Sequence, residues 1–168
     1  MPYIRSDKSS EVSRFKLLMV RQRVDGFQKA LAEYPEIKVV VVVETILPKE
    51  AVEPPIPPST IIAAYPNLAG IFSATGASAA QVGSALKEAE KCGKVQVYSW
   101  GIVQDGINLM REGCLQVFAS ERPYALVAQT VDALIAMIQN GTELPEVTDL
   151  GIILVNIGNL DSFLASNN

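Results

Sequence analysis

The sequence predicts an α/β domain in which helices flank a mostly parallel β-sheet on both faces, as a three-layer sandwich. Short apolar runs rich in β-branched residues alternate with segments in which apolar residues recur every three or four positions. Glycine follows most of the helical segments, as is typical of helix ends. The length of 168 residues suits one compact domain, and a hydrophobic content of 49% provides a sizeable core.

The N-terminal part predicts a helix, a buried strand and a proline-rich connection. Residues 10–34 carry one apolar stripe that Pro35 ends, formed by Val20, Val24, Phe27, Leu31 and Tyr34. The run at 37–43 is rich in valine, which is typical of a strand buried on both faces. Five prolines within 48–58 exclude a regular helix from the middle of that segment, and a short helix is expected at 59–65.

The rest of the chain repeats a strand-to-helix unit. Strands are expected at 69–74, 95–100, 115–120 and 151–155, with helices at 77–91, 103–112 and 124–139 and a polar tail. The last of these helices has an apolar stripe that we expect to be buried, formed by Val127, Val131, Leu134, Ile135 and Ile138. Successive strand-to-helix units imply parallel strands, and ligands of such sheets lie beyond the carboxyl ends of the strands. The residues expected at that edge are Glu44-Thr45, Thr75-Gly76, Trp100-Gly101 and Ser120-Glu121.

Composition excludes several function classes. The net charge of -4 and the absence of a long basic block argue against nucleic acid or an anionic membrane surface as partner. Histidine is absent, and scattered carboxylates such as Glu44 and Asp105 form no defined pair, so we expect no enzyme, metal or cofactor. Cys92 and Cys114 lack zinc-site spacing; two buried or half-buried thiols are favoured over a disulfide.

The ends of the chain and its apolar runs show no signal for export or membrane insertion. The first residues, MPYIRSDKSSEV, are polar and show no signal peptide, and the run at 37–43 is too short to span a bilayer.

Five segments carry, in order, the motifs of one known group of proteins. RQRVDGFQKALAEYPEIKVV (21–40) contains an Arg-x-x-Gly-Phe helix, and GIFSATGASAAQVGSALKEAEK (70–91) a strand followed by a helix with Ala-Leu-Lys-Glu-Ala near its end. KVQVYSWGIVQDGINLMREG (94–113) is a strand and a helix ending in glycine, and FASERPYALVAQTVDALIAMI (118–138) a Pro-Tyr helix entry. GIILVNIGNLDSF (151–163) is a terminal strand with an Asn-Leu-Asp-x-Phe tail. In these motifs the chain resembles the C-terminal lobe of ribose-type sugar-binding proteins, in the periplasmic binding protein type 1 family.

The resemblance implies a division of the chain and a function. It assigns residues 1–20 to a crossover remnant or helical lead-in, 21–163 to the sugar-binding lobe and 164–168 to a tail, with the family's first lobe missing. It implies a solute-binding module for a small sugar or polyol in an ABC-type uptake system, working outside the cytoplasmic membrane with a permease or a first lobe as partner. The alternatives are the effector-binding or dimerisation lobe of a sugar-responsive transcriptional regulator, and a truncated lobe without ligand.

The family's sugar-contacting positions carry over to Arg23, Thr75, Trp100, Gly101 and Glu121. Arg23 matches the family's arginine, whereas Thr75 and Gly76 replace an Asn-Asp, Gly101 an aspartate and Glu121 a glutamine. Trp100 fits equally a stacking platform for a ligand or a core aromatic. Glu121 either accepts hydrogen bonds from ligand hydroxyls or interacts with the positive end of the dipole of the following helix. A helix N-cap is the favoured role of Thr75 over ligand contact.

One lobe offers half of the family's cleft. The resemblance therefore predicts binding of about millimolar strength or weaker. It also predicts an exposed apolar edge around Trp100 and Phe118, which favours self-association.

Overall fold

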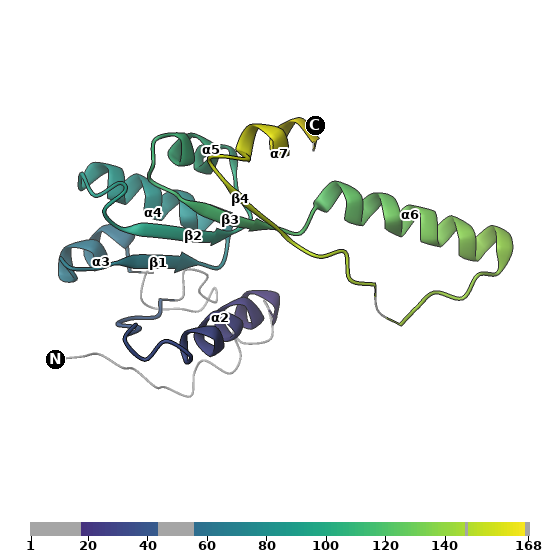
Figure 1. Ribbon diagram of the computed structural model, residues 1–168, viewed down its shortest axis with the longest axis horizontal. Helices are drawn as coiled ribbons and strands as arrows, with labels where there is room; N and C mark the ends of the chain where they lie inside the picture. The colour runs from purple at the N-terminus through teal and green to yellow at the C-terminus, as the bar shows by residue number, and fades with distance from the viewer. Residues whose placement is uncertain (1–17, 44–55, 147, 167–168) are drawn as a thin grey trace. The chain divides into compact units, whose positions relative to one another are not determined.

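The computed structural model describes residues 18–43, 56–146 and 148–166, and the chain divides into two compact units, 1–68 and 69–168 (Figure 1). The first unit contains α2 (Leu18–Leu31) and α3 (Pro58–Ala64). The second contains a sheet and the remaining helices, in the order β1 (Gly70–Ser73), α4 (Gly76–Glu88), β2 (Gln96–Trp100), α5 (Gln104–Arg111), β3 (Val117–Ser120), α6 (Pro123–Asn140), β4 (Ile153–Asn156) and α7 (Leu160–Ser166).

The sheet of the second unit has the strand order β1-β2-β3-β4. The first three strands are parallel, and β4 pairs antiparallel with β3. The α/β class with a mostly parallel sheet flanked by helices is therefore confirmed. The division of the chain at residues 20 and 163 stays a prediction.

Alternation along the strands creates one strongly buried sheet face. Val97, Phe118 and Val155 are each exposed by 1% or less. Phe118 is in register with Val155, so their side chains share that face. Helix α4 packs against β1, β2 and α5, and it buries Leu86 completely.

The first unit follows the predicted periodicity. On α2, Val20, Val24, Phe27 and Leu31 are the half-buried apolar residues, while Tyr34 lies after the helix and is exposed. Residues 10–17 of the predicted helix and most of the proline-rich segment lie outside the described residues. The short helix predicted at 59–65 is confirmed as α3, which begins with Pro58, where a proline without an N–H is tolerated.

The buried strand predicted at 37–43 is wrong. The structure assigns no strand there, and Ile37, Val39, Val40 and Val42 are each about half exposed, by 48 to 58%. A run of β-branched residues reports a local preference for extended backbone. A strand also needs a hydrogen-bonded neighbour, which the described residues do not provide.

The buried stripe predicted on α6 is also wrong. Helix α6 has no buried residue, and its large apolar side chains are exposed by 44 to 72%. The helical periodicity was read correctly, because the helix forms over Pro123–Asn140 and ends at Gly141 in a left-handed conformation. Periodicity defines an apolar face and does not identify the surface that covers it.

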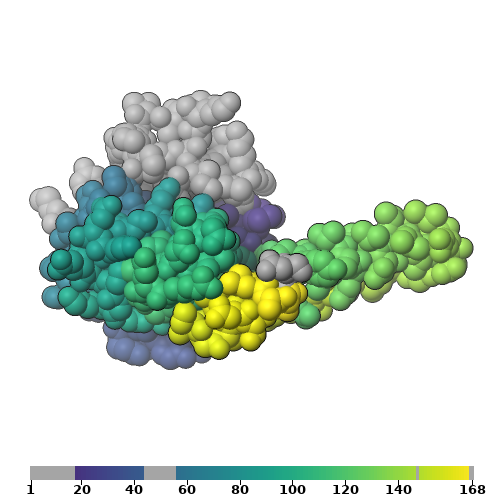
Figure 2. Space-filling view, turned by 90° about the horizontal axis from the view of Figure 1, so that it is seen from above, coloured from purple at the N-terminus to yellow at the C-terminus, as the bar shows by residue number. Residues whose placement is uncertain are grey.

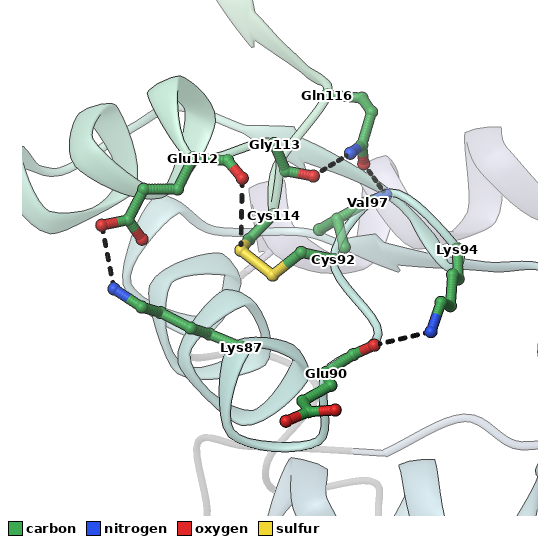
Figure 3. The surroundings of a disulfide bond; sticks show 9 residues. All are labelled: Lys87, Glu90, Cys92, Lys94, Val97, Glu112, Gly113, Cys114 and Gln116. Atoms are coloured by element: carbon green, nitrogen blue, oxygen red, sulfur yellow. Dashed lines mark hydrogen bonds and ion pairs between the residues drawn. A yellow bond between two sulfur atoms is a disulfide. The ribbon is translucent and has the colours of Figure 1, made fainter.

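The preference for free thiols is wrong as well, because Cys92 and Cys114 form a disulfide (Figure 3). Both cysteines lie where the chain leaves a helix and enters the next strand, one before β2 and one before β3. Since these strands are neighbours, the two turns meet, and the Cα atoms are 4.3 Å apart. Lys87 on α4 and Glu112 after α5 form an ion pair of 2.9 Å beside the bond.

Helix α7 was not predicted, since the end of the chain was expected to be a polar tail. It is held to the sheet by Leu160, which is 1% exposed, and by Phe163, whose ring packs edge-on against Phe118 at 5.4 Å. These are tertiary contacts that a local reading of seven residues does not reveal.

Candidate functional site

The carboxyl ends of β1, β2 and β3 lie at one edge of the sheet, because the three strands are parallel and in register. Ser73 pairs with Ser99, and Trp100 pairs with Ala119. Gly101 and Glu121 follow directly after β2 and β3, and Thr75 is the second residue after β1. Four of the five predicted ligand-binding residues are thus carried by neighbouring strand ends.

Thr75 belongs to a small network of hydroxyl groups. It is the N-cap of α4: its Oγ1 accepts from the backbone N–H of Ser78 at 3.3 Å and lies 2.8 Å from Ser78 Oγ. Ser73 Oγ donates to the carbonyl of Thr75 at 3.0 Å and also bonds with Ser78 Oγ. The N-cap role predicted for Thr75 is confirmed. Ser78 was missed, because it stands at the position where the recognised capping pattern has Glu or Gln.

Gly76 brings the first two loops of this edge into contact. A Cβ atom at Gly76 would lie 2.9 Å from the Cα and N atoms of Ile102 and 3.0 Å from the carbonyl carbon of Gly101. Only glycine permits this approach of two backbones without a shift. Gly101 itself has a φ of 73°, a left-handed conformation, and its carbonyl accepts from Ser99 Oγ at 2.7 Å.

Trp100 and Glu121 connect the second and third loops. The indole Nε1–H of Trp100 donates to Glu121 Oε1 at 2.8 Å. Trp100 is half-buried and Glu121 is exposed, so the ring is oriented by a carboxylate without being enclosed in the core. Sequence reasoning nominated both residues and missed that they bond to each other.

The prediction of an exposed apolar edge around Trp100 and Phe118 is wrong for Phe118. Phe118 is only 1% exposed. Trp100 is in register with Ala119, and side chains alternate between the two faces along a strand. Phe118, which precedes Ala119, therefore points to the face opposite to Trp100.

Arg23 lies half-buried on α2, in the first unit. Glu44 and Thr45, also expected at the strand edge, lie outside the described residues.

The chemistry of this edge is that of hydrogen bonding and ring contact. Its partly exposed polar groups are the hydroxyls of Thr75 and Ser78, the carboxylate of Glu121 and the indole of Trp100, while the Ser73 hydroxyl is buried beneath them. Such groups recognise sugar hydroxyls and C–H surfaces.

The helices of residues 18–43, 56–146 and 148–166 include no candidate for a membrane-spanning segment.

Comparison with solved structures shows that the chain is similar to sugar-binding proteins. A solute-binding protein of an ABC transporter from Burkholderia graminis, in complex with D-arabinose, is 27% identical with a TM-score of 0.69. One from Actinobacillus succinogenes with bound D-allose is 28% identical with a TM-score of 0.71. The match covers 84% of this chain and 50% of each of those proteins, so the chain spans about half their length. A glucose-galactose binding protein from Geobacillus stearothermophilus, at 18% identity and a TM-score of 0.69, shares the fold.

The search of curated proteins found no match to the chain. A family model agrees with the structural comparisons. A family model described as a periplasmic binding protein domain matches residues 19–143, which is most of the sequence and includes α2 and the strand ends β1 to β3. The chain therefore belongs to the periplasmic binding protein domain family.

Proposed function

We propose that the chain binds a small sugar or polyol at the carboxyl ends of β1 to β3, as the solute-binding part of an ABC-type uptake system. Its family, and the D-arabinose and D-allose bound by the two solute-binding proteins above, support this class of ligand. No bond of the ligand is made or broken in this role.

The observation that carries the proposal is the bonded pair of Trp100 and Glu121 at that edge. The bond restrains the orientation of the indole, and a restrained aromatic face suits the C–H surface of a sugar ring at a reduced entropic cost. A carboxylate accepts hydrogen bonds only, so Glu121 suits the hydroxyl donors of a neutral polyol.

Two further predicted site residues belong to the same unit as this edge and add to its surface. Thr75 contributes a hydroxyl that its cap geometry already orients, and Gly101 leaves room above the strand end because it has no side chain. Arg23 matches the family's arginine, and its role as a donor to sugar hydroxyls is proposed from that resemblance alone.

The setting is proposed to be outside the cytoplasmic membrane. The Cys92–Cys114 disulfide supports this, because such bonds persist mainly in oxidising compartments. The proposed partners are an ABC permease and a first lobe. Because the chain spans about half of its structural relatives, its affinity on its own is expected to be about millimolar or weaker.

Saturation-transfer-difference NMR suits this weak binding and tests the proposal directly. A panel of D-arabinose, D-allose and D-fucose is expected to give transfer to at least one sugar. Glu121→Ala is expected to reduce the transfer at least several-fold. Glu88→Ala, the same change of an exposed residue at the far end of α4, is expected to leave it unchanged. Absence of transfer to every sugar, with the chain folded by circular dichroism, would refute the proposal.

A further inference from the structure

We propose that Ser73, Ser99 and Ser120 are positioning residues of the strand-end site: each buried hydroxyl holds the backbone of the loop that carries the site's exposed groups. The ligand class in this inference rests on the proposed function, whereas the arrangement of the loops does not. The serines lie under the surface that meets the sugar, so they act on binding through the residues above them.

The three serines occupy equivalent places on neighbouring parallel strands. Ser73 and Ser120 are the last residues of β1 and β3, and Ser99 on β2 is in register with Ser73. Ser99 is also in register with Phe118, two positions before Ser120, so alternation along the strands puts the three hydroxyls on one face of the sheet. This face is covered by α4, α5 and α7, which lie on the same side of the sheet in Figure 1 and next to one another at the surface in Figure 2.

The burial of these hydroxyls requires partners inside the protein. The three serines are 4 to 6% exposed, and they are the buried polar side chains among the residues that the structure describes. A buried hydroxyl without a hydrogen bond lowers stability. In each case the partner is a main-chain group two residues further along: Ser73 Oγ donates to the carbonyl of Thr75 at 3.0 Å, Ser99 Oγ donates to that of Gly101 at 2.7 Å, and Ser120 Oγ accepts from the N–H of Arg122 at 3.3 Å.

The two bonded residues at the centre of the site lie inside these turns. Trp100 is the residue between Ser99 and the carbonyl that Ser99 binds, and Glu121 is the residue between Ser120 and the N–H that Ser120 binds. A side-chain hydrogen bond that spans a residue restrains the backbone on both sides of it. The bond between Trp100 and Glu121 therefore joins two side chains whose backbones are each held by a buried serine.

Both turns have backbone conformations that need such support. Gly101 and Arg122 are left-handed, with φ of 73° and 56°, and for Arg122, which has a Cβ atom, this conformation is uncommon and unfavourable. The N–H of Gly101 donates to the carbonyl of Ala119 at 2.8 Å, while Ser99 holds its carbonyl. We expect that loss of the Ser99 or Ser120 hydroxyl loosens one turn and weakens the contact between the indole and the carboxylate.

The indole signal of Trp100 in the sugar-free chain tests the inference by proton–nitrogen correlation NMR. Ser99→Ala removes the hydroxyl and little volume, and it is expected to shift the indole peak and to accelerate exchange of the indole proton with water at least several-fold, because the bond to Glu121 loosens. Ser99→Thr keeps a hydroxyl and is expected to keep the wild-type peak and exchange rate. Val97→Ala is the matched control, since it removes a buried side chain from the same face of β2; it is expected to lower stability and to leave the indole signal unchanged.

Ser120→Ala repeats the test from β3 and is expected to change the indole signal in the same way. Two results would overturn the inference. The first is a pair of folded chains, Ser99→Ala and Ser120→Ala, with the wild-type indole peak and exchange rate. The second is a Val97→Ala chain whose indole signal changes as much as that of the serine variants. Circular dichroism checks that each variant is folded.

Sugar binding is measured separately, by saturation transfer with the same sugars. Ser99→Ala is expected to reduce the transfer at least several-fold, and Val97→Ala to leave it unchanged. A wild-type chain that binds none of the sugars would refute the proposed function, whereas the measurements on the sugar-free chain still decide whether the serines hold the loops.

Discussion

Breaking the Cys92–Cys114 disulfide is expected to destabilise the chain by about 3 kcal/mol. The bond joins residues 22 positions apart, and closing a loop of this size lowers the entropy of the unfolded chain by an amount worth about 3 kcal/mol at 25 °C. For a chain of 168 residues this corresponds to a fall in Tm of roughly 6–12 °C.

Two perturbations measure this effect in different ways. Reduction of the wild-type chain removes the bond and leaves both side chains in place, whereas the double variant Cys92→Ala, Cys114→Ala removes the sulfurs as well. Alanine is chosen because Cys114 is 1% exposed, and a buried serine hydroxyl would add a cost of its own. Thermal unfolding followed by circular dichroism reports the Tm of each form.

The double variant is also the control, since a reductant should leave its Tm unchanged. A fall in the wild-type Tm of less than about 2 °C on reduction, equivalent to under about 1 kcal/mol, would refute the reasoning. So would alkylation of both cysteines in the unreduced, denatured chain, because a disulfide leaves no thiol to react.

Three further substitutions test the packing on which the strand-end site depends, each by the midpoint of urea unfolding. Gly76→Ala places a Cβ 2.9 Å from the backbone of Ile102 and is expected to cost about 1–3 kcal/mol; an unchanged midpoint would show that the two loops do not approach as described. Thr75→Ala removes the N-cap of α4 and is expected to cost about 1 kcal/mol, whereas a gain in stability would contradict the cap. Phe118→Ala removes a 1% exposed ring that packs on Phe163 and is expected to cost about 3–5 kcal/mol, and a loss below about 1 kcal/mol would show that this ring is not in the core.

The fold was predictable where local pattern and tertiary environment agree. Strands β1 to β3 and helices α3, α4 and α5 form within a few residues of their predicted ranges, because β-branched runs, helical periodicity and terminal glycines act locally. The run at 37–43 and the face of α6 follow the same local rules. Their burial depends on a partner surface that the pattern does not identify.

The candidate site was predictable in position and only partly in geometry. The rule for parallel sheets placed Thr75, Trp100 and Glu121 at one edge. It contains nothing about which side chains bond there, so the contact of Trp100 with Glu121 came from the structure. The disulfide shows a recoverable signal: Cys92 and Cys114 each lie beside a glycine, at equivalent turns of successive units.

The most direct test of sugar binding at this edge is the indole signal of Trp100 in a proton–nitrogen correlation spectrum. Trp100 is the only tryptophan, so its Nε1–H gives a single assigned peak, and that proton donates to Glu121. Titration with D-arabinose or D-allose is expected to shift this peak in a saturable manner in the wild-type chain, and to a smaller extent in Glu121→Ala. A sugar that binds while the indole peak stays in place would contradict a site at Trp100, and a peak that no sugar moves would contradict sugar binding at this edge.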